Sequence, residues 1–162
     1  MVDEFSSFAR MPRPNFETAD LAGICMNALV LPRSARPEIN FVTLIPKEKI
    51  QIRADTRQLS QVLTNLLQNA IDAIDGRDAS GVDPLPAGEI VLSVELNADK
   101  SAAVLSVQDN GRGLPPSLKD RLTEPYVTTR AKGTGLGLAI VKTILEGHGA
   151  SLGLKDSANG GA

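Results

Sequence analysis

The segment from Asp55 to Ile74 constrains the fold of this 162-residue chain more strongly than any other stretch. Its apolar residues recur at the i, i+3, i+4 spacing that places side chains on one face of an α-helix. The apolar set is Leu59, Val62, Leu63, Leu66, Leu67, Ala70, Ile71 and Ile74. Asp55 stands just before this pattern and can cap a helix N-terminus with its carboxylate. The sequence therefore predicts a long amphipathic helix whose apolar face has to be covered by the rest of the chain.

Shorter patterns on either side predict the remaining elements of an α/β domain. Asp20 is a suitable N-cap for a helix over LAGICMNALVL, which we expect Pro32 and Pro37 to end. β-Branched residues favour two short strands, over 39–45 and 49–54, as a pair around Pro46. Strands are also expected over 89–96 and 102–109 as a hairpin and over 150–155, and helices over 2–10, around SLKDRL and over 136–147. This order indicates an α/β sandwich with helices on one face of a mixed sheet.

Composition excludes several classes of function. The net charge is −2 and no basic stripe occurs, so nothing favours a nucleic-acid partner. The single cysteine, Cys25, rules out an internal disulfide and suits a reducing compartment, and its apolar neighbours predict a buried helix position. No apolar run reaches the roughly 18 residues of a membrane helix, and the acidic N-terminal segment is not a secretory signal. We therefore expect neither nucleic-acid binding nor membrane contact by these residues.

Two asparagines and an aspartate are predicted to cluster at the edge of the long helix's apolar face. Asn69 falls beside Val62, and Asn65 and Asp72 lie at i−4 and i+3 from it. Asparagine is mildly unfavourable inside a helix because its amide competes for backbone hydrogen bonds. One interpretation is a solvated polar face. The other is that an amide oxygen binds Mg²⁺, which prefers oxygen ligands and few protein groups beside substrate phosphates.

Asp109-Asn110-Gly111-Arg112-Gly113 ends the second strand of the predicted hairpin. An Asn-Gly turn into another strand is the simpler interpretation, but the residues that follow, LPPSLKDRL, do not resume strand alternation. The alternative is that Asp109 accepts a hydrogen bond from an amino group such as that of adenine. The two glycines would then let the backbone approach the flat base.

A second glycine-rich stretch, TTRAKGTGLGLAIVK, opens the helix predicted over 136–147. Glycines at a helix N-terminus expose N–H groups to an anion, and threonine hydroxyls and cations add donors around a phosphate. The GK[ST] ending of a P-loop is missing, and Leu138 stands where a dinucleotide-binding fingerprint requires glycine. A flexible loop before a helix remains the alternative. As a phosphate site, residues 124–134 could close over a ligand.

Taken together and in this order, these segments resemble the ATP-binding catalytic domain of bacterial sensor histidine kinases, in the superfamily that contains DNA gyrase and MutL. NLLQNAIDAI is similar to the N box, DNGRG to the G1 box, EPYVTTR to the F box and GTGLGLAIV to the G2 box. The resemblance covers about residues 18–155, and VDEFSSFARMP and EPYVTTRAKGTGLGLAIVK are most similar to NtrY-like nitrogen-regulatory kinases. It implies a Bergerat fold, with a mixed, mainly antiparallel sheet and about three helices on one face.

The resemblance also implies roles for individual residues. Asn69 would be the Mg²⁺ ligand, with Asn65 supporting the phosphates or the metal. Asp109 would bind the adenine amine of ATP, and Gly111 and Gly113 would line the base pocket.

A nucleotide lid is implied for the glycine-rich stretch. Tyr126 stands where the F box usually has phenylalanine. The lid residues would be Thr128, Thr129, Arg130, Lys132, Gly133, Thr134, Gly135, Leu136 and Gly137. Arg130 and Lys132 would touch the β- and γ-phosphates and act in catalysis together with Asn65 and Asn69.

Two features depart from the family pattern. Many histidine kinases carry Lys or Arg where this chain has Asp72, which either orients a Mg²⁺-bound water within the nucleotide site or is exposed. The phosphoacceptor histidine is absent, because the one histidine, His148, follows the G2 helix and is expected at a helix end or on the surface.

We therefore predict the end of a dimerisation-hairpin helix and a linker over 1–14, followed by an ATP-binding catalytic domain over 15–162 that lacks its final strand. The resemblance implies transfer of the γ-phosphoryl group of ATP to a histidine on the separate dimerisation domain, and then to a response regulator. It also implies a homodimer anchored in the bacterial inner membrane, with this domain in the cytoplasm. We expect the chain alone to bind ATP without autophosphorylation and with negligible turnover, because Asn65 stands where hydrolysing relatives carry glutamate. A gyrase- or MutL-like ATPase module and a non-catalytic nucleotide-binding interaction domain remain as alternatives.

Overall fold

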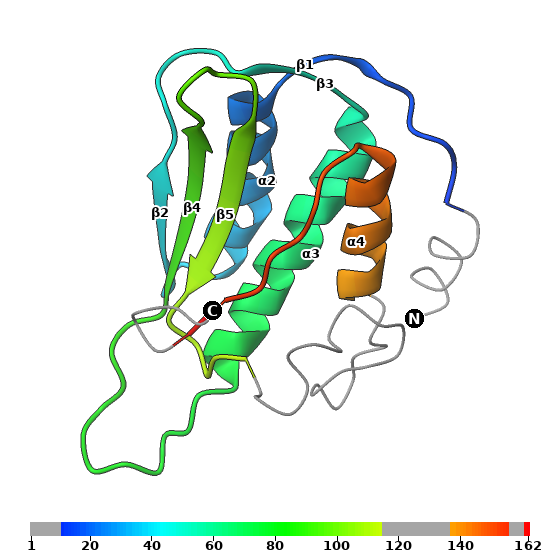
Figure 1. Ribbon diagram of the computed structural model, residues 1–162. Helices are drawn as coiled ribbons and strands as arrows, with labels where there is room; N and C mark the ends of the chain where they lie inside the picture. Colours follow the sequence, from blue (N-terminus) through cyan, green and yellow to red (C-terminus); the bar gives the residue numbers. More distant parts are fainter. Residues whose placement is uncertain (1–10, 115–136, 156–160) are drawn as a thin grey trace.

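The computed structural model describes residues 11–114, 137–155 and 161–162 (Figure 1). Their elements are β1 (Glu17–Asp20), α2 (Leu21–Ala35), β2 (Asn40–Leu44), β3 (Gln51–Ala54), α3 (Thr56–Asp75), β4 (Glu89–Leu96), β5 (Ala103–Asp109) and α4 (Gly137–Gly147). The helices predicted over 2–10 and around SLKDRL, and the loop predicted over 124–134, lie outside the described residues.

The long helix predicted from the periodic pattern is α3, and its prediction is confirmed. The Asp55 carboxylate caps it by accepting the Gln58 N–H at 3.1 Å. Its buried residues are Gln58, Val62, Leu63, Leu67, Ala70, Ile71 and Ile74. The apolar stripe read from the sequence is therefore the face of α3 that packs into the protein.

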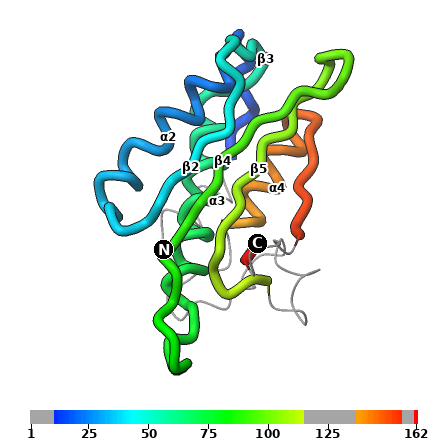
Figure 2. The backbone as a smooth tube through the Cα atoms, turned by 90° about the vertical axis from the view of Figure 1, so that its left-hand side faces the viewer, coloured from blue at the N-terminus to red at the C-terminus, as the bar shows by residue number. Residues whose placement is uncertain are grey.

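The strands form two small sheets rather than one. β4 is the central strand of a three-stranded sheet, in which it pairs parallel with β2 and antiparallel with β5. β1 and β3 form a separate antiparallel pair. Figure 2 looks onto the three-stranded sheet with the helices behind it, so the predicted α/β sandwich with helices on one face of a mixed sheet is confirmed.

The expected pairing of the strands over 39–45 and 49–54 is wrong. β2 pairs with the buried central strand β4, whereas β3 pairs with β1, which the sequence did not predict. β4 offers β2 a partner with three buried apolar side chains, Ile90, Leu92 and Val94. β1 has the sequence ETAD, in which Ala19 is the one apolar residue, so it carries no apolar alternation that would mark it as a strand.

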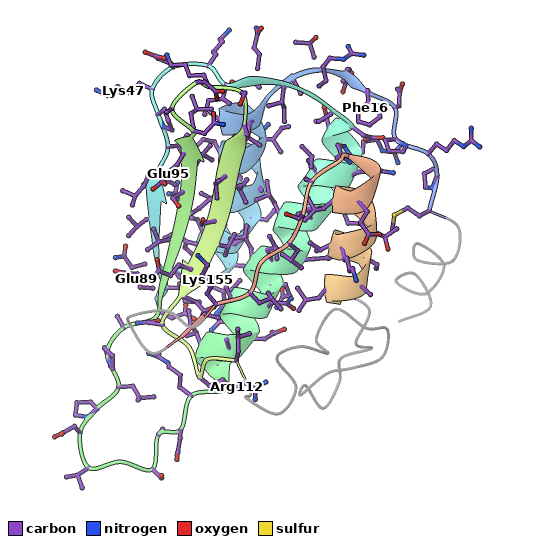
Figure 3. All side chains as sticks on the ribbon, in the orientation of Figure 1. Phe16, Lys47, Glu89, Glu95, Arg112 and Lys155 are labelled. Atoms are coloured by element: carbon purple, nitrogen blue, oxygen red, sulfur yellow. The ribbon has the colours of Figure 1, made fainter. Side chains whose placement is uncertain are left out.

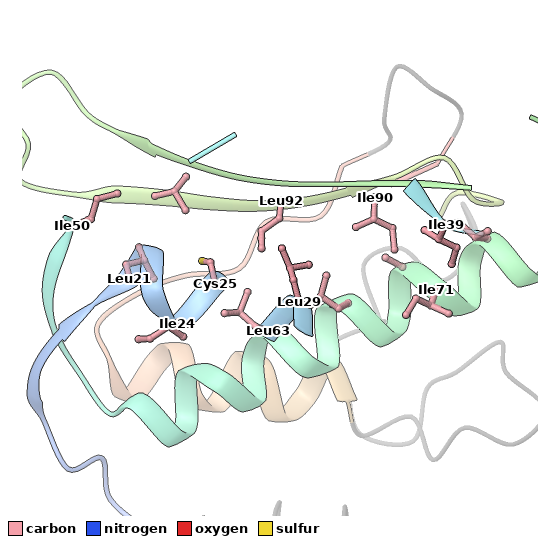
Figure 4. Close-up of a cluster of buried hydrophobic side chains, with 14 residues drawn as sticks. Leu21, Ile24, Cys25, Leu29, Ile39, Ile50, Leu63, Ile71, Ile90 and Leu92 are labelled. Carbon is pink, nitrogen blue, oxygen red and sulfur yellow. The ribbon is translucent and has the colours of Figure 1, made fainter. Parts of the chain in front are cut away.

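The main core lies between α2, α3 and the sheet (Figure 4). Leu21, Ile24, Cys25 and Leu29 of α2 meet Leu63, Leu67 and Ile71 of α3 and the inward residues of β4. A second cluster joins α3 to α4 through Val62, Ile140, Val141 and Ile144. Since α3 contributes to both clusters, it holds the sheet and α4 in one arrangement.

The prediction that Pro32 helps to end α2 is wrong. The helix includes Pro32 and runs to Ala35, and the Arg36 N–H then donates to the Pro32 carbonyl oxygen at 2.9 Å. A proline removes only its own N–H donor and clashes with the turn before it, and here the following turn still closes. Pro37, one residue beyond the cap, is where the helix can no longer continue.

The strand expected over 150–155 is also absent from the described residues. Leu152 packs instead against the α3–α4 cluster. Gly149, with φ +69°, turns the chain just before this segment and carries it back along α3. The alternating leucines of ASLGLK thus bury one side chain on helices rather than on a sheet.

None of the helices in the described part of the chain is long and apolar enough to cross a membrane.

Cys25 is fully buried in α2, as predicted, and this position determines its reactivity. Burial, together with the nearby Asp20 carboxylate, raises the pKa of the thiol to about 11. Because the thiolate is the reactive form, a disulfide reagent at pH 8 should modify the folded protein roughly 100-fold more slowly than the unfolded protein. Equal rates in the two states would contradict the placement of Cys25 in the core.

Candidate functional site

Asn65, Asn69 and Ala73 lie at four-residue intervals and form one stripe along α3. The loop after β5 and the start of α4 both contact this stripe. The Asn65 amide donates to the carbonyl oxygen of Gly137, the first residue of α4, at 3.3 Å. Two turns further on, the Ala73 carbonyl oxygen accepts the Arg112 N–H at 3.0 Å. Asn69 lies between these contacts, about 6 Å along the helix axis from each. α3 thereby brings the glycine-rich loop after β5 and the start of α4 to opposite sides of Asn69.

Asp109 is the last residue of β5 and is buried, with 6% of its surface exposed. Its Oδ1 accepts the Gly111 N–H at 2.8 Å and the Ala162 N–H at 3.2 Å. Burial raises the pKa of this carboxyl group, although the two N–H donors act in the opposite direction. Since both of these hydrogen bonds end on Oδ1, Oδ2 is left as an acceptor for a donor from a ligand.

Asn110 holds the loop after β5 against the start of β4. Its Oδ1 accepts the Glu89 N–H at 2.8 Å, and its Nδ2 donates to the Ala87 carbonyl oxygen at 2.9 Å. In the described residues up to 114 no strand follows Asn110-Gly111, so the simpler interpretation, a turn that leads directly into another strand, does not apply there. Asn110 was not among the predicted site residues. The signal that could have revealed its role is an Asx side chain beside glycine, which commonly bonds to backbone groups.

Gly111 lies against the C-terminal part of α3. A Cβ atom placed on Gly111 would lie 2.5 Å from the Ala73 carbonyl carbon. Gly113 has φ +82°, a conformation that favours glycine. Helix packing at Gly111 and backbone conformation at Gly113 thus each require glycine, independently of any ligand. Figure 3 shows the neighbouring Arg112 at this end of α3.

The α3 stripe can contribute a metal ligand only through neutral oxygens or a single carboxylate. Among residues 11–114, 137–155 and 161–162, no group of three His, Cys, Asp or Glu side chains could hold a metal ion. Asp72, which is half-buried, accepts a hydrogen bond on Oδ1 from Gln68 at 2.9 Å. The half-buried Asn69 side chain makes no hydrogen bond within these described residues. The donor set therefore fits a cation that arrives with most of its ligands already in place, as Mg²⁺ does with nucleotide phosphates.

The remaining predicted site residues lie outside the described part of the chain. They are Tyr126, Thr128, Thr129, Arg130, Lys132, Gly133, Thr134, Gly135 and Leu136. Of the predicted lid, only Gly137 is placed, at the first position of α4 beside Asn65.

Comparison with known proteins agrees with this geometry. Residues 54–162 match the family model described as histidine kinase-, DNA gyrase B-, and HSP90-like ATPase. The nitrogen regulation protein NtrY of Azorhizobium caulinodans is 45% identical over 160 residues, which are 99% of this chain and 20% of that protein. The catalytic domain of the histidine kinase ThkA superposes with a TM-score of 0.73 at 29% identity, covering 90% of this chain and 91% of that structure. The same kinase in complex with the response regulator TrrA gives a TM-score of 0.72 at 26% identity, covering 92% of this chain and 40% of that chain.

The chain therefore belongs to the family of histidine kinase-, gyrase B- and HSP90-like ATPases. Within it, the chain is similar in sequence to part of the NtrY protein and in structure to the catalytic domain of a histidine kinase. The predicted Bergerat fold is confirmed by the same comparisons. The chain spans about a fifth of the length of the NtrY protein that it matches.

The close approach of Gly111 to α3 makes a substitution at this position costly. Gly111→Ala should lower the free energy of unfolding by about 2–3 kcal/mol, because the added methyl group meets the Ala73 backbone, which cannot move without shifting α3. Gly81→Ala is the matched control, since a Cβ atom there meets nothing within 4 Å, and it should change stability by less than about 0.5 kcal/mol. Denaturant titration of both variants measures the difference, and equal stabilities would contradict the packing of the loop on α3.

Proposed function

We propose that this domain binds Mg²⁺–ATP along α3, between Asp109 and Asn69, and presents the γ-phosphoryl group to a histidine on a separate dimerisation domain. The observation that carries the proposal is the meeting of three segments on one helix face. Asn65 contacts the start of α4, Ala73 contacts the loop after β5, and Asn69 lies between them. Membership in the ATPase family supports ATP as the nucleotide.

Asp109 is suited to bind the adenine amino group. A buried carboxylate has lost hydration, so a donor that reaches Oδ2 replaces a lost hydrogen bond and favours the ionised form. The raised pKa of Asp109 records that lost hydration in the absence of such a donor. Gly111 and Gly113 hold the loop beside this carboxylate, and in the proposal they border the base pocket.

Asn69 is suited to complete the coordination of Mg²⁺, and Asn65 to support the phosphates. When bound, Mg²⁺ would neutralise phosphate charge during phosphoryl transfer. The Asn65 amide already holds the first carbonyl of α4, so the same residue fixes the N-terminus of that helix relative to Asn69. In the proposal, residues 128–137 bind the phosphates as a lid, with Arg130 and Lys132 supplying positive charge and Tyr126 bordering the nucleotide. Asp72, which accepts a hydrogen bond from Gln68, would orient a Mg²⁺-bound water in this site.

The acceptor histidine belongs to another part of the protein in this proposal. His148 is engaged by two hydrogen bonds at the far end of α4 and is not a candidate for it. An imidazole that attacks the phosphoryl group is itself the nucleophile, so the domain needs no side chain that activates water. The chain alone should therefore bind ATP with negligible turnover and without autophosphorylation.

The proposed setting follows from the same function. Residues 1–14 would carry the end of the dimerisation hairpin and the linker, with the ATP-binding domain over 15–162. A response regulator would take the phosphoryl group, as the complex of ThkA with TrrA suggests for a related kinase. The whole protein would be a homodimer anchored in the bacterial inner membrane, with this domain in the cytoplasm where ATP is available.

Asp109→Asn should weaken ATP binding without lowering the stability of the fold. The amide keeps an oxygen for the N–H groups of Gly111 and Ala162 but turns an NH₂ group toward the adenine amine. Affinity for ATP should fall about 10- to 100-fold, the effect of losing a hydrogen bond to a charged group. Calorimetric titration with ATP measures this loss, and unchanged affinity would remove Asp109 from the site.

The same variant should be at least as stable as the wild type without nucleotide at pH 7. A carboxyl group whose folded pKa is raised destabilises the folded state above that pKa. This stability difference should shrink as the pH falls through the folded pKa toward the unfolded value of about 3.9, because the wild-type group then becomes neutral as well. Thermal unfolding at pH 7 and pH 4 compares the two proteins.

Asn69→Ala tests the metal role and with it the proposed function. In the wild type, Mg²⁺ should raise the affinity for ATP, and in the variant this increase should drop by about tenfold while Mg²⁺-free binding persists. Thr64→Ala, an exposed change on the same helix, should keep the full Mg²⁺ effect. Titrations with Mg²⁺ and with a chelator measure the ratio. A Mg²⁺ effect of wild-type size in Asn69→Ala would contradict the proposal.

A further inference from the structure

Residues 11–17, called here the strap, lie against the N-terminal end of α3 and the C-terminal end of α4. Met11 packs on the α3–α4 cluster. The Pro12 carbonyl oxygen accepts a hydrogen bond from the buried Gln58 side chain at 3.0 Å. Pro14 lies beside Gly147, since a Cβ atom placed on Gly147 would lie 3.4 Å from Pro14 Cγ. Residues 11–14, which the sequence assigns to the linker, therefore pack on the domain.

Polar contacts continue along the strap to the start of β1. The Asn15 N–H donates to Asp55 Oδ2 at 2.9 Å, and Glu17 accepts the Thr56 hydroxyl at 2.6 Å. The Phe16 ring meets the His148 ring edge-to-face, with centroids 5.2 Å apart and an interplanar angle of 71°. Figure 3 shows Phe16 at this end of α3, opposite the end at which Arg112 lies.

His148 connects α3 and α4 at the end where the strap packs. Its Nε2 accepts the Asp55 N–H at 3.0 Å, and its Nδ1 lies 2.8 Å from the Ile144 carbonyl oxygen. Because a carbonyl oxygen can only accept, Nδ1 carries the proton and Nε2 carries the lone pair. These two partners fix the orientation of the imidazole ring.

Asp55 connects this imidazole to the strap. Its backbone N–H is bound to His148, while its carboxylate caps α3 and holds the Asn15 N–H. The Asn15 N–H is also the main cause that holds the pKa of Asp55 below its usual value. Displacement of the imidazole would leave the Asp55 N–H unbonded and remove the ring on which Phe16 packs.

We infer that His148 is a positioning residue that latches the strap to the ATP-binding domain, so that the chain preceding Met11 leaves from a fixed place at the α3–α4 end. α4 is attached to α3 at both of its ends, by Gly137 to Asn65 and by His148 to Asp55. The latch and the nucleotide site are thus opposite ends of the same helix pair. If the proposed function holds, the latch fixes the point on the ATP-binding domain from which the phosphoacceptor domain is tethered.

Amide hydrogen exchange of the 162-residue chain tests the latch without nucleotide. In His148→Ala, the Asn15 and Asp55 amides should exchange at least about tenfold faster than in the wild type, whereas the Leu63 amide in the middle of α3 should not change. His148→Gln is the conservative variant, since its side chain can accept from Asp55 and donate to Ile144. It should restore both amides to within about threefold of the wild type.

Phe16→Ala provides a second, milder variant, because Phe16 is 42% exposed and its removal leaves the Asp55–His148 bond in place. It should accelerate Asn15 about threefold and leave Asp55 unchanged. Slow Asn15 exchange in both His148→Ala and Phe16→Ala would overturn the inference. Equal acceleration of Leu63 and Asn15 in His148→Ala would also overturn it, because the strap and the core would then open together.

ATP titrations of the same variants separate this inference from the proposed function. The ATP affinity of His148→Ala should lie within about twofold of that of the wild type, because the strap lies at the end of α3 opposite the proposed nucleotide site. If the wild type itself fails to bind ATP, the proposed function fails while the exchange results still decide whether the latch exists.

Discussion

The burial of one face of α3 is the constraint on which the rest of the structure depends. That face meets α2 and the sheet on one side and α4 on the other, so α3 belongs to both apolar clusters. A helix held on two sides cannot rotate, because its side chains are packed at close to crystal density. The polar residues at the edge of the buried face, Asn65 and Asn69, are therefore held in register with the elements that surround them.

The proposed site contains two groups whose hydrogen-bonding capacity a ligand would satisfy better than the fold does. Asp109 is a buried carboxylate with a raised pKa, and Asn69 is a half-buried amide without a hydrogen bond in the described residues. A purine amine at Asp109 and a phosphate-bound cation at Asn69 would each relieve such a deficit. Gly111 and Asn110, in contrast, are committed to packing and to backbone hydrogen bonds, and they hold the loop that carries Asp109.

What the sequence could predict follows from how local the responsible interactions are. The limits of α3 and of the β4–β5 hairpin were predictable because periodicity and an adjacent cap define them. The partners of β2 and β3, and the docking of Leu152 on helices, depend on contacts between distant segments, which no local pattern records. Asn69 and Asp109 were identified because their segments resemble family motifs. The contact of His148 with Asp55 was not predicted, because the two residues lie 93 positions apart in the sequence.

The most direct test of the central claim is a crystal structure of the domain with Mg²⁺ and a non-hydrolysable ATP analogue. The account predicts the adenine amino group about 3 Å from Asp109 Oδ2 and the metal about 2.1 Å from Asn69 Oδ1, with one nucleotide making both contacts. A nucleotide bound elsewhere, or one whose metal has no contact with Asn69, would contradict it.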